Sequence, residues 1–297
     1  MLNDYLQYQE LEHGLAGNTI SAYRRDIKEF IKLAGLRSNF NIPTRTVNQY
    51  LTHLNQLNRR PASIARKISS LKGFFGYLVE KNIAAANPFE HLRSPRLSRY
   101  HPEYLSVSEI EEILRQPDLK TKAGIRDLAI LELLYGTGMR ISELINLRLA
   151  AVYDEVGFIK IIGKGNKERL VPYGSHARTA VARYIEEIRE DKKRHAQSDV
   201  LFLSNRNRKF SRVAVWKIIK KYAARAEISK PVTPHTFRHS FATHMIEGGA
   251  DLRTVQELLG HTSITTTQIY TRIDKEYLLT VHRDYHPRER KTECKRD

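Results

Sequence analysis

Apolar side chains in the first third of the chain recur every three or four positions, the spacing of one buried helix face. Three such stretches lie between residues 1 and 87: the first ends at Gly35, and the others open at Pro43 and Pro61. Their apolar positions are Ile20, Tyr23, Ile27, Phe30 and Ile31; Val47, Tyr50, Leu51 and Leu54; and Ile64, Ile68, Leu71, Phe74, Phe75 and Leu78. Proline at a start and glycine at an end are typical helix boundaries. The pattern predicts a compact helical bundle over residues 1–87.

A segment rich in proline and arginine interrupts this pattern over residues 88–104. Its prolines, which cannot continue a helix, are Pro88, Pro95 and Pro102. Its arginines, spaced along an extended backbone, are Arg93, Arg96 and Arg99. Ser106 and Glu109 follow with the spacing of a capping box, which marks the start of a new helix. We therefore expect a linker over residues 88–104 and a second domain over residues 105–297.

The second domain mixes helical and strand-like patterns. Residues 125–135 are apolar on most sides, which predicts a buried helix. Residues 158–163 and 169–173 are short apolar runs that flank a Lys-Gly-Asn-Lys turn and predict a hairpin, with residues 200–203 as a third strand. Further helices are expected over residues 176–191, 211–226, 235–248, 251–259 and 274–283. The fold class is therefore mainly α with a small antiparallel β-sheet (α+β).

The charge of the chain narrows the choice of partner. Its 297 residues include 50 lysines and arginines against 33 aspartates and glutamates, a formal net charge of +17. Such a surplus repels itself unless a polyanion offsets it, so nucleic acid is the first partner to consider. An acidic membrane surface is the second, and a basic surface without any partner is the alternative.

The sequence has no features of an exported or membrane protein. Cys294 is the single cysteine, so it cannot form an intrachain disulfide, and its charged tail offers no metal-ligand companions. No apolar run reaches the length of a membrane span, and acidic residues stand where a signal peptide would be basic. We expect an intracellular, cytoplasmic protein.

Residues 234–244 bring three histidines and one arginine to a predicted helix start. His235 and Arg238 are three positions apart and share one helix face in the first turn, where free amides favour an anion. This pair suits a phosphate group. His235 and His239 have the spacing of two zinc ligands, but residue 236 is threonine rather than the glutamate of a zinc-protease motif, and no third ligand is evident. We therefore expect no metal.

Tyr270 gains significance only in combination with other residues. A phenol has a pKa of about 10, so it acts as a nucleophile at neutral pH only beside a base or concentrated positive charge. His235, Arg238 and His261 can supply these. Taken alone, Tyr270 is one of 15 tyrosines and is interpreted as a packing residue.

Two further positions are ambiguous on their own. Arg140 follows a Gly-Thr-Gly turn and precedes Glu143 by one helical turn, which by itself indicates only a surface ion pair. Lys164 lies at the tip of the predicted hairpin, where a solvated lysine is the ordinary interpretation. Spacing alone does not connect these residues with the histidines.

Four motifs in order connect them by resemblance. GTGMRISEL, GKGNKERLVP, PHTFRHSFATHMIEGGADLRTVQELLGH and TTTQIYT span residues 135–271 and resemble the tyrosine recombinase (phage integrase) superfamily, in particular its Xer-type site-specific recombinases. The resemblance implies a SAM-like core-binding domain over residues 1–87 and a catalytic domain with a C-terminal oligomerisation helix over residues 105–297. It implies the catalytic residues Arg140, Lys164, His235, Arg238, His261 and the nucleophile Tyr270, with Glu143 in a supporting role.

The implied chemistry is the cutting and rejoining of duplex DNA through a 3′-phosphotyrosyl intermediate. Two guanidiniums and two imidazoles stabilise the charge on the phosphate in place of a metal. His235 is the candidate base, His261 the hydrogen-bond donor and Lys164 the acid for the departing 5′ oxygen. The covalent bond conserves the phosphodiester energy, so no ATP or other cofactor is expected.

The resemblance also implies partners. We expect duplex DNA with a short, partly palindromic site such as a dif-like site for resolving chromosome or plasmid multimers. A homo-tetramer, or a hetero-tetramer with a paralogous recombinase, would act on the nucleoid, with a DNA translocase of the FtsK type as a further partner. The expected C-terminal helix docks on a neighbouring protomer, or closes on its own domain as the alternative. Candidate DNA-binding residues are Arg93, Arg96, Arg99, Arg212 and Lys217.

Two other functions stay open from sequence. A type IB topoisomerase shares the nucleophile and the arginine, lysine and histidine apparatus, but relaxes supercoils as a monomer. A non-enzymatic DNA-binding protein would use the basic surplus for binding and Tyr270 for packing. The helices over residues 61–81 and 211–226 are candidates for reading the major groove, and a solvated basic face is the alternative for either.

Overall fold

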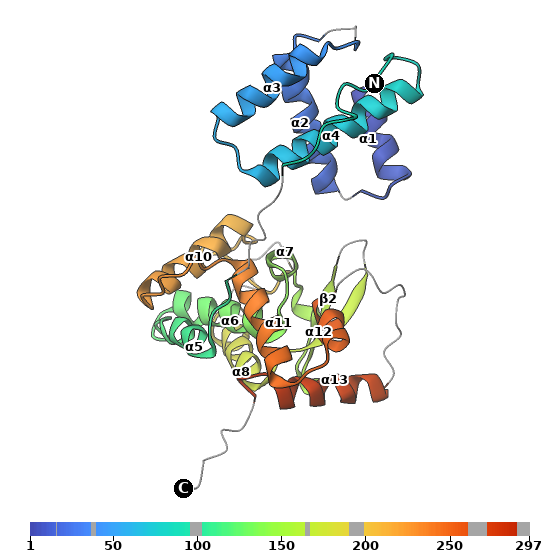
Figure 1. Cartoon of the computed structure of the whole chain (residues 1–297). Coiled ribbons are helices and arrows are strands. Elements are labelled where there is room, and N and C mark those ends of the chain that lie inside the picture. Colours follow the sequence, from blue (N-terminus) through green and yellow to red (C-terminus); the bar gives the residue numbers. More distant parts are fainter. Residues whose placement is uncertain are drawn as a thin grey trace. The chain divides into compact units, whose positions relative to one another are not determined.

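The computed structural model of the chain describes residues 1–15, 17–36, 40–95, 103–163, 167–189, 199–260 and 272–289. It forms two compact units, Met1–His101 and Pro102–Asp297 (Figure 1). Each unit has its own hydrophobic core. The described helices include none that is both long and apolar enough to cross a membrane.

The unit Met1–His101 is a bundle of helices, as the periodicity predicts. Its helices are α1 (Leu2–Leu11), α2 (Gly17–Leu33), α3 (Thr44–Gln56) and α4 (Pro61–Glu80). Aromatic rings fill its centre, where Phe30 contacts Tyr50 and Phe89 edge-on with ring centroids 4.9 and 5.2 Å apart. Lys67 on α4 is buried and pairs with Asp26 on α2, so the two central helices are also joined by charge.

The unit Pro102–Asp297 surrounds one nearly fully buried helix, α6. Its described α-helices are α5 (Val107–Arg115), α6 (Lys122–Thr137), α7 (Ile141–Leu144), α8 (Ser175–Tyr184), α10 (Arg212–Arg225), α11 (Pro234–Gly248), α12 (Leu252–Leu259) and α13 (Arg272–Tyr285). The predicted capping box is present at the start of α5, where Ser106 accepts from the amide of Glu109 and Glu109 accepts from the amide of Ser106. Because α6 is almost fully buried, the apolar pattern over residues 125–135 correctly predicted a core helix.

A small antiparallel sheet completes this unit and confirms the fold class. Strands β1 (Val152–Tyr153), β2 (Phe158–Ile162) and β3 (Glu168–Pro172) pair in the order β1-β2-β3. The third strand is not residues 200–203, so that prediction was wrong. Those residues make only isolated bridges, Val200 with Arg148 and Leu203 with Lys209, and their apolar character reflects burial in the core.

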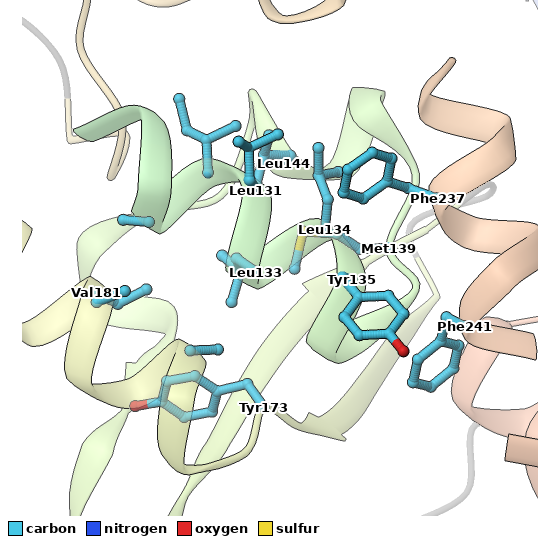
Figure 2. Close-up of a cluster of buried hydrophobic side chains, with 14 of the residues drawn as sticks. Leu131, Leu133, Leu134, Tyr135, Met139, Leu144, Tyr173, Val181, Phe237 and Phe241 are labelled. Carbon is cyan, nitrogen blue, oxygen red and sulfur yellow. The ribbon is translucent and has the colours of Figure 1, made fainter. Parts of the chain in front are cut away.

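Helix α11 is anchored to the core by its aromatic face. Figure 2 shows Phe237 and Phe241 directed toward Leu134, Tyr135 and Met139, which come from α6 and the turn that follows it. Phe237, Phe241 and Tyr135 are all fully buried. This packing fixes the position of the residues on the neighbouring face of α11, Arg238 among them.

Candidate active site

Arg140 is held at the junction between a glycine turn and a short helix. Helix α6 ends at Thr137 and is capped by Gly138, whose φ of +58° lies in the left-handed region that glycine adopts without strain. A Cβ atom at Gly138 would lie 2.4 Å from Cδ1 of Phe241, so α11 packs against bare backbone there. The amide of Arg140 donates to Oε2 of Glu143 (2.7 Å), and its Nη1 donates to Oε1 (3.0 Å). Both the backbone and the guanidinium of Arg140 are therefore oriented by Glu143.

Arg238 reaches the same place from α11. Its Nη1 donates to the carbonyl of Gly138 (2.7 Å), and its Nη2 donates to the carbonyl of Leu259 (2.6 Å). Burial, followed by the positive charge of Arg140, lowers the pKa of Arg238 to about 10. Because this value stays above neutrality, Arg238 remains a cation that lies close to a second cation.

His235 occupies the first turn of α11. Thr233 caps this helix by accepting from the amide of Thr236, and Pro234 is its first residue. The His235 side chain is exposed, three positions before Arg238. His239, the second residue considered for zinc, is half-buried. Among the described residues, no three His, Cys, Asp or Glu side chains gather in a way that could hold a metal ion.

The last turn of α12 is where three arginines converge. The carbonyl of Leu258 accepts a hydrogen bond from Arg169 (2.9 Å). The carbonyl of Leu259 accepts from both Arg238 (2.6 Å) and Arg140 (3.4 Å). The carbonyl of Gly260 accepts from Arg140 (3.4 Å). The carbonyls of a final turn have no partner within their own helix and carry partial negative charge. We call Arg140, Arg169, Arg238 and Glu143 the arginine cluster.

One member of this cluster, Arg169, was not among the residues predicted from the sequence. This residue of β3 donates Nη1 to Oε1 of Glu143 (3.0 Å) and Nη2 to Oε2 (2.9 Å), a planar two-bond pairing. Burial alone would raise the pKa of Glu143, but hydrogen bonds from Arg169 and Arg140 outweigh it and lower that pKa below its ordinary value. Glu143 is therefore ionised at neutral pH and neutralises part of the cluster.

One sequence signal could have identified Arg169. It pairs with Ile161 across the hairpin, and strand alternation places it on the same side as Val171, which is fully buried. A charged residue at a core position of a strand is rare unless it has a partner. The partner, Glu143, lies in another motif, so the pattern within the hairpin does not reveal it.

Five of the predicted site residues lie outside the described residues: Lys164, His261, Tyr270, Arg96 and Arg99. The two glycines that precede Lys164 and His261 are described, and both border the arginine cluster. A Cβ atom built on Gly163 would lie 3.6 Å from Nη1 of Arg169 and 3.9 Å from Oε1 of Glu143. A Cβ atom on Gly260 would lie 2.9 Å from Nη1 of Arg169.

The predicted DNA-binding residues that are described lie on other elements. Arg212 and Lys217 are exposed on α10, beside Trp216, which is 42% exposed and lies under the ammonium of Lys220 at 5.8 Å. Arg93 is exposed in the unit Met1–His101. Helix α10 therefore presents a basic and aromatic face.

Helix α13 packs on its own domain. Nε2 of His282 donates to the carbonyl of Gly136 (2.7 Å), and after the helix Arg288 donates to Glu132 (2.5 Å). Glu289 accepts from the amide of Ser175 (2.6 Å). These contacts lie within one chain, and docking of a C-terminal helix on a neighbouring protomer stays a prediction.

Comparisons with known proteins agree over nearly the whole chain. The model of the phage integrase family matches residues 103–277, and that of the phage integrase N-terminal SAM-like domain matches residues 2–82. The chain is 41% identical to tyrosine recombinase XerD of Halalkalibacterium halodurans over 97% of both chains. It is 42% identical to tyrosine recombinase XerD of Staphylococcus aureus, over 97% of this chain and 99% of the relative.

Solved structures share the fold. One is the XerH site-specific recombinase bound to a palindromic difH substrate, with a TM-score of 0.68 and 24% identity over 87% of this chain and 77% of that chain. Another is a lambda integrase dimer bound to a COC′ core site, with a TM-score of 0.69 and 19% identity over 99% of this chain and 79% of that chain. At these identities the likeness is one of architecture.

Proposed function

Because the chain belongs to the phage integrase family, we propose that it is a site-specific DNA recombinase that cuts and rejoins duplex DNA through a phosphotyrosyl intermediate. The observation that carries the proposal is the convergence of Arg140 and Arg238 on the last turn of α12. That turn leads directly into the segment with His261 and Tyr270. Two neighbouring guanidiniums suit the nonbridging oxygens of a phosphodiester, each through a planar fork of donors.

The proposed reaction is an in-line displacement at phosphorus. The Tyr270 hydroxyl attacks, its proton passes to His235, and a bond forms between Oη and phosphorus as the bond to the 5′ oxygen breaks. Lys164 protonates that 5′ oxygen. Arg140, Arg238 and His261 stabilise the charge that builds on the nonbridging oxygens. Attack by the 5′ hydroxyl of another strand reverses these steps and releases Tyr270.

Glu143 and the two domains complete the assignment. Glu143 holds Arg140 through a side-chain pair at 3.0 Å and thereby acts as a supporting residue. Residues 1–87 would serve as core-binding domain and residues 105–297 as catalytic domain, with the basic linker 88–104 between them. Phosphate contacts from Arg93, Arg96, Arg99, Arg212 and Lys217 would supply salt-dependent affinity.

The substrate follows from the relatives. Two of them are named tyrosine recombinase XerD, and the solved XerH complex contains a difH substrate. We therefore propose a short, partly palindromic dif-like site on the bacterial nucleoid and the resolution of chromosome or plasmid multimers. A solved lambda integrase is a tetramer on a Holliday junction, which supports a tetrameric assembly here, of one protein or with a paralogue. A DNA translocase would be a further partner.

The direct test is covalent trapping. A nicked suicide substrate carries the site with a nick close to the cleavage position. Cleavage releases the short fragment that bears the 5′ hydroxyl, so the strand cannot be rejoined and the covalent intermediate accumulates. We expect a protein–DNA adduct with the wild-type chain and none with Tyr270→Phe, which keeps the ring and lacks the hydroxyl. Site-dependent binding without any adduct would favour the non-enzymatic protein. Relaxation of a supercoiled plasmid lacking the site would favour the topoisomerase.

A further inference from the structure

We propose that Arg169 is a positioning residue of the recombination site, which locks Glu143 between β3 and the last turn of α12 and thereby aims Arg140 at the scissile phosphate. The inference rests on the proposed function. Arg169 uses all three of its guanidinium nitrogens within the protein: Nη1 and Nη2 on Glu143, and Nε on the carbonyl of Leu258. It is only 7% exposed. All three nitrogens are therefore bonded within the protein, and burial leaves little of the guanidinium accessible to DNA.

The orientation of Arg140 depends on this anchor. Its guanidinium makes one short side-chain bond, to Glu143 at 3.0 Å, whereas its contacts with the carbonyls of Leu259 and Gly260 are 3.4 Å long. Bonds of that length are weak. The Arg140 side chain is also 38% exposed, against 7% for Arg169, so packing restrains it less. Glu143, only 5% exposed and held by Arg169 through two bonds, is therefore the principal support of Arg140.

Arg169 also joins three segments that the reaction requires. Glu143 belongs to α7, Arg169 to β3, and Leu258 to the helix that precedes His261. Gly163, one residue before Lys164, lies close enough for a Cβ atom to contact Nη1 of Arg169 at 3.6 Å. A lysine at position 169 would keep the charge but could not form the two-bond fork and the third bond at once.

The test compares Arg169→Gln and Arg169→Lys with a matched control, Arg126→Gln. Arg126 is also 7% exposed, and it donates to Asp127 (2.7 Å) and Asn205 (2.6 Å), away from the arginine cluster. Single-turnover cleavage of the suicide substrate is measured for the full-length protein, at a protein concentration that saturates the DNA. We expect both Arg169 variants to cleave about 10- to 100-fold more slowly with unchanged site affinity, as misorientation at a reacting centre does. Arg126→Gln should cleave at the wild-type rate.

A pH profile separates positioning from general destabilisation. In Arg169→Gln, Glu143 loses its two-bond partner and becomes easier to protonate, so the cleavage rate should fall more steeply on acidification toward pH 6 than the wild-type rate does. The double variant Glu143→Gln/Arg169→Gln should lose this additional fall and follow the wild-type pH dependence. A rate restored by Arg169→Lys, or an equal loss in Arg126→Gln, would overturn the inference. If the wild-type chain forms no adduct, the proposed function fails. If the wild-type chain forms the adduct and Arg169→Gln cleaves at the same rate, only the role of Arg169 fails.

Discussion

Arg140 and Arg238 donate to one oxygen atom. The carbonyl oxygen of Leu259 lies 2.6 Å from Nη2 of Arg238 and 3.4 Å from Nη1 of Arg140. Like charges so close repel each other, and the lowered pKa of Arg238 reflects burial first and this repulsion second. An anion between the two guanidiniums relieves that repulsion, so the pair favours a charged phosphate more than two isolated arginines would.

We expect Arg140→Ala and Arg238→Ala to reduce cleavage by at least about 10²- to 10³-fold, because each removes a donor that stabilises transition-state charge. Site binding should remain largely intact, since many other phosphate contacts supply affinity. Cleavage is measured by suicide-substrate trapping and binding by gel shift on the same preparations. Thermal unfolding serves as the control, because Arg238 also satisfies the carbonyl of Gly138. Equal losses of binding and cleavage would contradict the assignment.

Lys164→Ala should slow cleavage of ordinary DNA and be rescued on a substrate whose 5′ bridging oxygen is replaced by sulfur. A thiolate is a far better leaving group than an alkoxide and needs no proton, so the acid becomes dispensable. The ratio of rates on the two substrates is the measurement. Tyr270→Phe is the matched control, because loss of the nucleophile cannot be rescued by a better leaving group. A Lys164→Ala defect of equal size on both substrates would remove the lysine from this role.

Regular elements with strong periodicity were predictable from the sequence alone. The apolar face of residues 64–78 became α4, and the nearly continuous apolar run of residues 125–135 became the buried helix α6. These patterns succeed because helix burial is decided by neighbours three and four positions away. The pairing of Arg140 with Glu143 was accessible for the same reason.

Contacts between distant segments were not predictable in this way. Arg169 is recognisable only from its bonds to Glu143 and Leu258, which are remote in sequence. Residues 200–203 have a strand-like composition, but β1 takes the place beside β2, and the segment is buried with single bridges. In both cases the tertiary partner decides the outcome, and local propensity carries no information about it.

Gly138→Ala should destabilise the catalytic domain by about 2 kcal/mol or more, through left-handed strain and overpacking together. An added Cβ would lie 2.4 Å from Cδ1 of Phe241 and 2.8 Å from Cδ2 of Leu259. Gly157→Ala is the matched control: its φ is +70°, but its Cβ would meet Leu279 at an ordinary 3.7 Å. Denaturant unfolding of both variants measures the difference. Equal destabilisation would show that strain alone, and not the close approach of α11, requires glycine at position 138.

Arg212→Ala and Lys217→Ala should each weaken site binding and reduce the slope of log affinity against log salt by about one, the effect of one lost phosphate contact. Both residues are exposed on the same helix, α10. Arg183→Ala is the control, because Arg183 is an arginine of α8 whose side chain is 41% exposed and pairs with Glu187. Affinity is measured by fluorescence anisotropy over a salt series. A slope unchanged in the α10 variants, or changed equally in the control, would indicate a solvated basic face.

Stability should fall as the pH drops below about 6.5, the ordinary pKa of histidine. The rings of His282 and His286 stack on each other with centroids 4.7 Å apart. His286 also contacts the rings of Tyr135 on α6 and Phe241 on α11. Burial lowers the pKa of both, and for His286 the charge of His282 lowers it further. The folded state therefore binds fewer protons than the unfolded state below the ordinary pKa. Each excluded proton costs about 1.4 kcal/mol per pH unit until the folded pKa is reached.

The His286→Phe variant isolates this effect. Phenylalanine keeps an aromatic ring beside Tyr135 and Phe241 but cannot titrate, so thermal unfolding between pH 7 and pH 5 should depend less on pH than in the wild type. His176→Gln is the control, since His176 is exposed on α8 and its loss should leave the dependence unchanged. Other charged or titratable groups nearby are Glu132, Arg288 and His244. Burial also lowers the pKa of His244, so part of the pH dependence of stability should persist in His286→Phe. An undiminished dependence in His286→Phe would assign it to groups other than the stacked pair.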